Sequence, residues 1–461
     1  MSDAVDAVLA QVRERVTPDA AERERMAAVV AEVTDRAEAA VADLPVEAEV
    51  VHAGSTARDT WLAGDRDVDV FVAFPPDLGR EDLETYGLEV GHAVLPAGHE
   101  EFAEHPYVVG AVEGFEVDLV PCYRVASATE IQSAVDRTPF HTRYLAERLD
   151  AERAGDVRVL KQLLSAVGAY GSDLRTRGFS GYLVELLVLA YGGARAVLEA
   201  AADWTPPVVL DPADHGTATF EDPLVVVDPT DPERNVAAVT SARNVARLQH
   251  HARRVLAEPA LDQFEPREPE PLPAGAVVEA FEERGTTPLA VRVRVPPLVD
   301  DELWPQLERS LAGVGGELDR RGFEVLRSAV FATGRAAGAG PESERTAALL
   351  WELAVAERPA IERHEGPPVA VREHAERFLA TEREGPVYGP FVDGDRYVIE
   401  REREFERAAT FLASEAVFDV ALGQAVAAAM REEYDVLVGS GVGDLAADFG
   451  VDLARYVDPK P

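Results

Sequence analysis

The stretch GSTARDTWLAGDRDVDVF, which begins at Gly54, constrains the fold of this chain more than any other feature. A glycine and a serine are followed closely by two aspartates with one valine between them. The run DVDVFVAF predicts a strand, so Asp67 and Asp69 share one face while Val68 and Val70 turn into the core. Two carboxylates this close repel each other, and a divalent cation such as Mg²⁺ removes that cost. The simpler alternative is a strand edge on an acidic surface.

The neighbours of the aspartate pair favour a phosphate-binding site. Gly54 and Ser55 follow the strand-like run EVVHAG and are expected to open a short helix, whose first amides and hydroxyl can hold a phosphate. Arg58 lies on the same helical face and can donate to that phosphate. The strand FEVDLVP supplies a third carboxylate, Asp118, with Glu116 as a lesser alternative on the same face. Together these groups describe a two-metal site for a nucleoside triphosphate, although the chain has no P-loop motif.

The net charge of the chain indicates the salt concentration in which the protein works, but it does not restrict its binding partners. Acidic residues number 84 against 45 lysines and arginines, for a net charge of −39, and they are spread over the whole sequence. This pattern is typical of proteins from salt-loving organisms, in which molar salt screens the repulsion. The alternative is an acidic interaction protein of a low-salt cytoplasm. Because adaptation to high salt would explain the negative charge, the charge does not exclude a nucleic-acid partner.

Cysteine usage and hydropathy argue against a disulfide-rich protein, a cysteine-based zinc protein and a membrane protein. The single cysteine, Cys122, rules out a disulfide framework and a cysteine-based zinc site. No segment approaches about 20 apolar residues, and no basic region precedes an apolar run near the N-terminus. We therefore expect a cytoplasmic protein without a membrane partner.

Hydrophobic periodicity divides the chain into modules. Residues 20–43 predict an amphipathic helix, and YVVGAVEGFEVDLVPCYRV predicts a hairpin with Gly114 in its turn. From about residue 150 the pattern is helical, with stripes at Leu160–Val167 and Leu183–Ala190 and a long helix from Asn235 to Pro259. The connector EPREPEPLPAG is the best domain boundary.

The C-terminal part predicts one or two small α+β modules. PLAVRVRVP, FEVLRSAVFA and AALLWELAVAE predict strands, and the first of these places Arg292 and Arg294 on one face. FVDGDRYVIERE predicts a hairpin with Asp393 and Gly394 in its turn. Helices are expected from Leu303 to Leu318 and from about Phe405 to the AVAAAM segment.

Three blocks in order carry a resemblance to a known family. The first is the opening block that begins at Gly54. The second is RVLKQLLSAVGAYGSDLRTRGFSGYLVELLVLAYG from Arg158 to Gly192, and the third is DPERNVAAVTSARNVARL. With the opening block they resemble the archaeal, class I, CCA-adding tRNA nucleotidyltransferases of the polymerase-β-like superfamily, along essentially the full chain. The residues of the opening block that match the superfamily signature are Gly54, Ser55, Arg58, Thr60, Leu62, Gly64, Asp67, Asp69 and Phe71.

The resemblance implies an α+β multidomain fold with a head, a helical neck, a body and a tail. The implied ranges are 1–150 for the catalytic head, 151–265 for the neck that recognises nucleotide and tRNA end, and 266–461 for the C-terminal body with a tail inserted at about 330–390. The implied activity is template-independent addition of C, C and A to the 3′ end of tRNA from CTP and ATP, with Mg²⁺ as cofactor. The oligomeric state stays open, and the resemblance favours a homodimer.

The resemblance also implies site residues. Asp67, Asp69 and Asp118 are the catalytic and metal-binding carboxylates. Many relatives carry Glu at the first position, and the shorter Asp67 leaves open whether it is a ligand or a supporting group. The nucleotide contacts that carry over are Gly54, Ser55, Arg58, His141, Lys161, Tyr170 and Arg234.

The residues themselves support these contacts unevenly. Only Lys161 and Lys460 are lysines, so an internal lysine suggests a role that arginine cannot fill, such as a compact charge against a triphosphate. Tyr170 and His141 are open between a ligand contact and a packing role. Arg234, with Asn235, lies at an expected helix start and is open between base reading and helix capping.

Four further arginines are considered for the RNA backbone. Arg175 and Arg177 follow Tyr170 in a loop and are expected to reach phosphates. Arg292 and Arg294 are open between the tRNA backbone and an ion-paired surface.

Two other functions remain in consideration. A poly(A) polymerase or another polymerase-β-like nucleotidyltransferase would share the opening block but not the second. A non-enzymatic RNA-binding scaffold would have lost catalytic carboxylates, whereas all three acidic positions are filled here.

Overall fold

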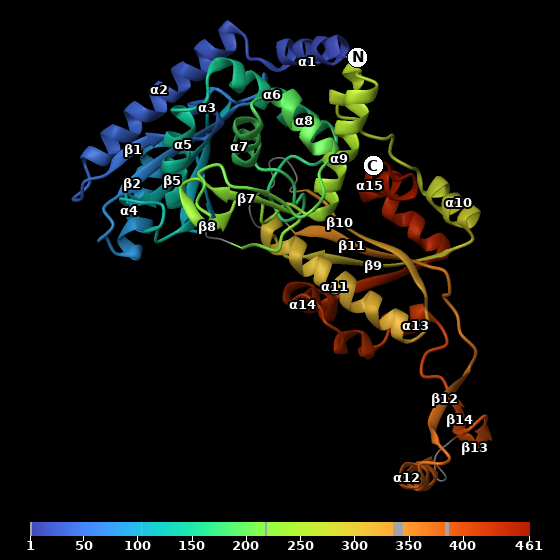
Figure 1. Cartoon of the computed structure of the whole chain (residues 1–461). Helices are drawn as coiled ribbons and strands as arrows, with labels where there is room; N and C mark the ends of the chain where they lie inside the picture. Colours follow the sequence, from blue (N-terminus) through green and yellow to red (C-terminus); the bar gives the residue numbers. More distant parts are fainter. Residues whose placement is uncertain (1, 103, 217–218, 335–343, 383–386) are drawn as a thin grey trace. The chain divides into compact units, whose positions relative to one another are not determined.

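The computed structural model describes residues 2–102, 104–216, 219–334, 344–382 and 387–461 (Figure 1). The chain forms two compact units, Met1–Arg267 and Glu268–Pro461, and the division falls inside the proline- and glutamate-rich connector. Helices and mixed or antiparallel sheets occur in both units, so the expected α+β multidomain class is confirmed.

A five-stranded sheet in the first unit carries the Asp67-Val68-Asp69 segment. Its strand order is β1-β2-β5-β4-β3, in which β2 and β5 are parallel and the other pairs antiparallel. Helices α2 and α4 cover one face, where Val68 and Val70 are buried, and the predicted alternation is confirmed (Figure 1). The hairpin at Gly114, with a φ of +82°, is confirmed too. The elements are α2 (Ala20–Ala42), β1 (Glu49–His52), α3 (Gly54–Ala57), β2 (Asp67–Phe74), α4 (Arg80–Val94), β3 (His99–Phe102), β4 (Pro106–Val112) and β5 (Phe115–Tyr123).

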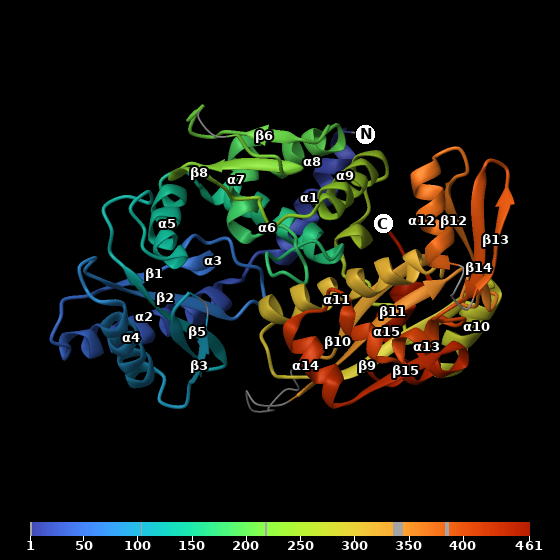
Figure 2. The same ribbon diagram turned by 90° about the horizontal axis from the view of Figure 1, so that it is seen from below.

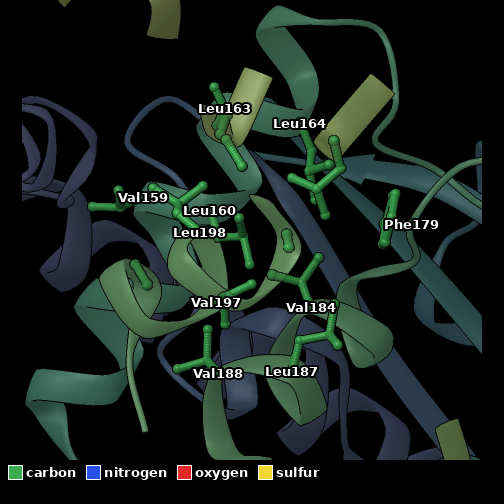
Figure 3. Packing of buried hydrophobic residues seen from close by; sticks show 14 of the residues in the cluster. Val159, Leu160, Leu163, Leu164, Phe179, Val184, Leu187, Val188, Val197 and Leu198 are labelled. Atoms are coloured by element: carbon green, nitrogen blue, oxygen red, sulfur yellow. The ribbon is translucent and has the colours of Figure 1, made fainter. Parts of the chain in front are cut away.

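A helical layer completes the first unit. Figure 3 shows its core, in which aliphatic side chains of α6, α7 and α8 interdigitate. Each such fully buried side chain contributes roughly 1.5–3 kcal/mol relative to exposure. The N-terminal helix α1, which the sequence did not predict, adds Val5, Leu9, Val12 and Val16 to this core. The helices are α1 (Ser2–Val16), α5 (Thr138–Ala146), α6 (Ala151–Ala166), α7 (Gly181–Tyr191), α8 (Ala194–Ala202) and α9 (Ala242–Ala257), with 3-10 turns at Ala134–Arg137 and Leu261–Phe264.

No single helix in the described part of the chain is long and apolar enough to cross a membrane. Helices α7 and α8 pass a test of length and composition only as a pair bent by 89°.

The region after residue 150 contains helices as expected, but it also contains strands that the sequence did not predict. A three-stranded sheet of order β6-β7-β8 lies there, formed by β6 (Val208–Leu210), β7 (Leu224–Asp228) and β8 (Asp231–Asn235). The long helix expected from Asn235 begins only at Ala242, because Ser241 caps it by accepting a hydrogen bond from Asn244 N. Asn235 instead ends β8, and its side-chain oxygen accepts from the backbone of Val226. Arg234 therefore lies on a strand rather than at a helix start.

The second unit contains a four-stranded antiparallel sheet of order β10-β11-β9-β15. Helices α11 and α14 pack on one face and α10 and α15 on the other (Figures 1 and 2). The predicted alternation in β9 is confirmed, since Val291, Val293 and Val295 are buried against the α11 side. The elements are α10 (Ala274–Arg284), β9 (Thr287–Val295), α11 (Asp300–Arg320), β10 (Val325–Ala332), β11 (Arg345–Leu353), α14 (Gln424–Glu432), β15 (Tyr434–Val438) and α15 (Ala446–Val457), with a 3-10 turn at Gly439–Leu445.

A smaller sheet of order β12-β14-β13 belongs to the same unit, with α12 beside β12 (Figure 2). Its hairpin turns at Asp393 and Gly394, as predicted. Of the tail range expected at about 330–390, residues 335–343 and 383–386 lie outside the described residues. The elements are β12 (Ile361–Pro368), α12 (Arg372–Glu382), β13 (Val387–Asp393) and β14 (Arg396–Glu402).

The single helix expected from about Phe405 is wrong. The chain forms α13 (Ala408–Leu412), a 3-10 turn (Glu415–Asp419) and α14. Ser414 caps the start of the 3-10 turn by accepting a hydrogen bond from Ala416 N, and Val420 is extended. Gly423 then passes against Gln306 so closely that an added Cβ would lie 2.5 Å from Gln306 Cβ.

Candidate active site

The parallel pairing of β2 and β5 brings the predicted carboxylates together. The register places Asp69 opposite Asp118 and Asp67 opposite Glu116. Residues paired on adjacent strands point to the same side of the sheet, at a strand spacing of about 4.8 Å. Among the described residues, none of Asp67, Asp69 and Asp118 has an ion pair or hydrogen bond to its carboxylate. The chain therefore holds unpaired acids side by side on the face opposite α2 and α4.

Gly54 is required by the approach of Asp69. Its φ of +70° lies in the left-handed region, and a Cβ added there would stand 1.7 Å from Asp69 Oδ2. Only glycine lets the start of α3 lie directly against this carboxylate. Ser55 opens the same turn, and its backbone oxygen accepts from the amides of Arg58 and Thr60.

Burial and mutual repulsion raise the pKa values of Asp69 and Asp118 on this face. The pKa of Asp118 is raised to about 7, first by burial and then by the negative charges of Asp69 and Glu116. Burial also raises the pKa of Asp69, against the opposing positive charge of Arg58. A charged state that the protein destabilises in this way is the state that a cation would stabilise.

Arg58 and Lys161 supply positive charge beside the carboxylates through a buried network. Arg58 Nε donates to Glu185 Oε1 over 3.0 Å, and these two side chains are 8% and 0% exposed. Thr60 Oγ1 donates to the same Glu185 oxygen over 2.5 Å. Lys161 is 2% exposed and its Nζ donates to the Thr60 carbonyl over 2.9 Å. The network therefore ties the segment after α3 to helices α6 and α7.

Lys161 and Tyr170 lie at the same place in the fold. The Lys161 ammonium is 6.0 Å from the centroid of the Tyr170 ring. Burial lowers the pKa of Lys161, while the charge of Glu185 opposes that shift. The pKa of the Tyr170 hydroxyl is raised, mainly by burial and then by the negative charges of Glu185 and Asp65. Two residues that the resemblance assigns to the nucleotide therefore lie close together in the structure.

His141 and Arg234 converge on a second buried acid, Asp228. His141 Nε2 and Arg234 Nη1 lie 2.8 and 2.7 Å from Asp228 Oδ2. The Tyr182 hydroxyl donates to Asp228 Oδ1 over 3.2 Å, and its ring stacks on His141 at 3.9 Å. Burial alone would raise the pKa of Asp228, but hydrogen bonds from His141 and Thr230 bring it below its usual value.

Helix α5 connects this cluster to the first network. Arg58 Nη1 donates to Thr142 Oγ1 over 3.3 Å, and Thr142 follows His141 directly. The charge of Arg58 accordingly contributes to the lowered pKa of His141, after burial as the main cause. The residues expected to bind nucleotide therefore form one connected region of the first unit.

The remaining arginines have different surroundings. Arg177 lies in a turn with a φ of +49°, and its carbonyl accepts from Ser241 N. In the second unit Arg292 pairs with Asp435 over 2.7 Å, the ion-paired alternative, whereas Arg294 is exposed.

Sequence reasoning missed two residues that organise the site. Glu185 is the one acid inside the apolar run GYLVELLVLAY, and a lone charge on a buried helix is a detectable signal. Asp228 ends the buried strand LVVVD, but nothing in the sequence shows that His141, Tyr182 and Arg234 gather around it.

The carboxylate face suits a divalent cation. Asp69 and Asp118 offer hard oxygen donors without competing partners, next to a glycine that leaves no side chain in the way. In the described residues, no group of three or more His, Cys, Asp or Glu side chains is already arranged to hold a metal ion. The donors fit a hard divalent cation such as Mg²⁺, which is commonly bound through one or two carboxylates and keeps several waters as its other ligands.

Three family models match successive parts of the chain. A nucleotidyltransferase domain covers residues 35–141, the second domain of tRNA nucleotidyltransferase covers 155–265, and the C-terminal domain of CCA-adding enzyme covers 284–439. A solved complex described as E. coli MS115-1 CdnC with ATP aligns over 56% of this chain and 94% of its own, with a TM-score of 0.44 and 17% identity. That likeness is too weak to carry an argument.

Curated relatives are similar along the full length. The CCA-adding enzyme of Haloarcula marismortui is 63% identical over 100% of both chains, and that of Halobacterium salinarum is 58% identical over 100% of both. The CCA-adding enzyme of Methanosarcina barkeri is 37% identical over 97% of both. The chain therefore belongs to the archaeal CCA-adding enzymes, which are tRNA nucleotidyltransferases.

Proposed function

We propose that this CCA-adding enzyme joins nucleotides by attack of the terminal tRNA 3′-hydroxyl on the α-phosphate of CTP or ATP. The bond from O3′ to the α-phosphorus forms, the bond to the β-phosphate oxygen breaks, and pyrophosphate leaves. The observation that carries this proposal is the side-by-side placement of Asp69 and Asp118, which have no ion-pair partner among the described residues, next to the positive charges of Arg58 and Lys161. The catalytic carboxylates are then Asp67, Asp69 and Asp118.

Asp69 and Asp118 would hold Mg²⁺, with Asp67 at the exposed edge as a further ligand or a supporting group. When bound, the ion would lower the pKa of the attacking hydroxyl and neutralise charge on the triphosphate. The protein contributes the positions: Gly54 keeps the space beside Asp69 free of a side chain.

The nucleotide contacts form the second part of the proposal. Ser55 and Arg58 at the α3 turn face the triphosphate, with Tyr170 close by. Lys161 is directed at the Thr60 carbonyl, so its role is to hold the α3–β2 segment and add a fixed positive field. His141 and Arg234, held by Asp228, contact the nucleotide.

The proposal also divides the chain into three functional modules. We propose a catalytic head at 1–150, a neck at 151–265 and a C-terminal tRNA-binding part at 266–461. Side chains of helix α1 share a core with those of α6 to α9, which supports assigning this helix to the neck.

The direct test supplies a tRNA that ends at its discriminator base, together with each nucleotide in turn, in molar KCl with Mg²⁺. CTP alone should add two C residues, CTP with ATP should add C, C and A, and growth should then stop. A long A tail on unstructured RNA would favour a poly(A) polymerase. No incorporation at any salt concentration would favour the scaffold.

A further inference from the structure

Helix α9 has a charge pattern opposite to that of the rest of the chain. In a protein with 84 acidic residues, its sixteen residues ARNVARLQHHARRVLA contain four arginines and two histidines and no acid. A solvated helix in so acidic a chain would be expected to carry acids, as α2 does with Glu22 in its first turn. The composition of α9 therefore requires a specific explanation.

The positive residues of α9 form one stripe. Arg243, Arg247, His250 and Arg254 follow at intervals of four, three and four, which places them on one face of a helix. The opposite face, with Val245, Leu248, Ala252 and Val255, is buried in the core. At about 1.5 Å per residue the stripe extends for about 16 Å.

In the part of the chain that the structure describes, no carboxylate pairs with the stripe arginines. Arg243 and Arg254 are exposed, and within the described residues neither pairs with a carboxylate. Arg247 donates only to neutral oxygens, those of Gly168 and the Asn244 side chain, each at 3.2 Å. Burial lowers the pKa of Arg247, and the neighbouring charge of Arg243 adds to that effect.

The N-terminal end of the stripe adjoins the proposed nucleotide site. Asn244 Nδ2 donates to the carbonyls of Thr176 and Arg177 over 2.7 and 2.9 Å. The loop that these bonds fix begins at Gly168 and carries Tyr170, which lies beside Lys161. From this end the stripe continues along α9 for several times the length of one phosphate group.

We propose that Arg243, Arg247 and Arg254 of α9 bind the phosphate backbone of the tRNA acceptor arm next to its 3′ end. This inference rests on the proposed function. A free nucleotide cannot occupy a stripe of this length, whereas a duplex strand presents a regular row of phosphates along its axis. Contacts to the backbone hold any tRNA without reading its sequence, as one enzyme for all tRNAs requires.

The test compares two double variants that lose the same charge. The stripe variant is Arg243→Gln with Arg254→Gln, because neither side chain bonds within the described protein. The charge-matched control is Arg25→Gln with Arg36→Gln, two exposed arginines of α2 in the same unit, of which Arg36 pairs with Glu32. Each enzyme is assayed with tRNA lacking CCA and with CTP and ATP, and tRNA binding is measured across a series of KCl concentrations.

The stripe variant should raise KM for tRNA about five- to tenfold, with kcat and KM for CTP unchanged, while the control stays within about twofold. The plot of log Kd for tRNA against log KCl should lose about two units of slope. Equal tRNA binding by both variants would overturn the inference and leave α9 a solvated face. Failure of the unaltered enzyme to add C, C and A would instead contradict the proposed function, and the binding series would still test the stripe.

Discussion

At the residue scale, the proposed site depends on Asp69 and Asp118, which the fold places side by side without an ion-pair partner among the described residues. Asp118→Asn should lower kcat for nucleotide addition by at least about 100-fold, because a neutral amide is a poor ligand for a hard cation. Asp69→Asn should do the same. The control is Glu116→Gln, an exposed neighbour on the same strand, which should stay within about threefold. Near-normal turnover by either Asn variant would contradict the carboxylate assignment.

The same substitution gives a stability prediction with a defined sign. The folded pKa of Asp118 is about 7, above the unfolded value of about 3.9, so the folded state binds more protons between these values. Stability without divalent ions should therefore fall as pH rises from about 4 to 7. In a chelator, the Tm of the unaltered protein should decrease across this range more than that of Asp118→Asn. If Tm falls with pH equally in both proteins, the negative charge of Asp118 does not destabilise the folded state, which would contradict this prediction.

Lys161→Arg tests whether the buried site of Lys161 accepts only the smaller ammonium group of lysine. The side chain is 2% exposed, so the larger guanidinium of Lys161→Arg should cost about 1–3 kcal/mol of folding free energy through overpacking. Displacement of Thr60 should also move Arg58 and raise KM for both CTP and ATP. Steady-state kinetics and denaturant unfolding measure the two effects. A loss of stability with unchanged KM for both nucleotides would make Lys161 purely structural.

At the element scale, Glu185 on α7 fixes the segment between α3 and β2. Glu185→Ala would leave Arg58 buried without its carboxylate, at a cost of about 3–5 kcal/mol. Glu185→Gln retains one acceptor oxygen and should fold, but it should raise KM for CTP and ATP because Arg58 loses its fixed position. Glu199→Gln on the exposed side of α8 is the control. If Glu185→Gln keeps a normal KM for both nucleotides, Arg58 does not depend on α7 for its placement.

At the scale of the whole molecule, the net charge of −39 predicts a requirement for salt. The Debye length is about 10 Å at 0.1 M and about 3 Å at 1 M, so added KCl should reduce repulsion among surface carboxylates. Thermal melts should show a Tm that rises steadily from about 0.1 to 3 M KCl. Sucrose at matched osmolality separates charge screening from solute exclusion. A flat salt profile would contradict this prediction.

The sequence by itself determined the local elements whose side chains repeat with a clear period. The alternation in DVDVFVAF defined β2 and both of its faces, and the spacing of Leu160, Leu163 and Leu164 defined α6. Glycine at a positive φ marked the turns at Gly114 and Gly394. These features are local, because they depend on the steric limits of a few neighbouring residues. The same alternation indicated the carboxylate pair Asp67 and Asp69, whereas the nucleotide contacts were named from the family resemblance.

Only the tertiary structure decided which distant residues meet. The β2–β5 register that pairs Asp69 with Asp118, the convergence of His141, Tyr182 and Arg234 on Asp228, and the link from Glu185 to Arg58 join segments far apart in the chain. The strand at Asn235 was missed for a related reason, since its pairing with Val227 overrides the helical spacing read from the sequence. Burial makes such pairings obligatory, because a buried polar group must find a partner, but which partner depends on the packing of the whole unit.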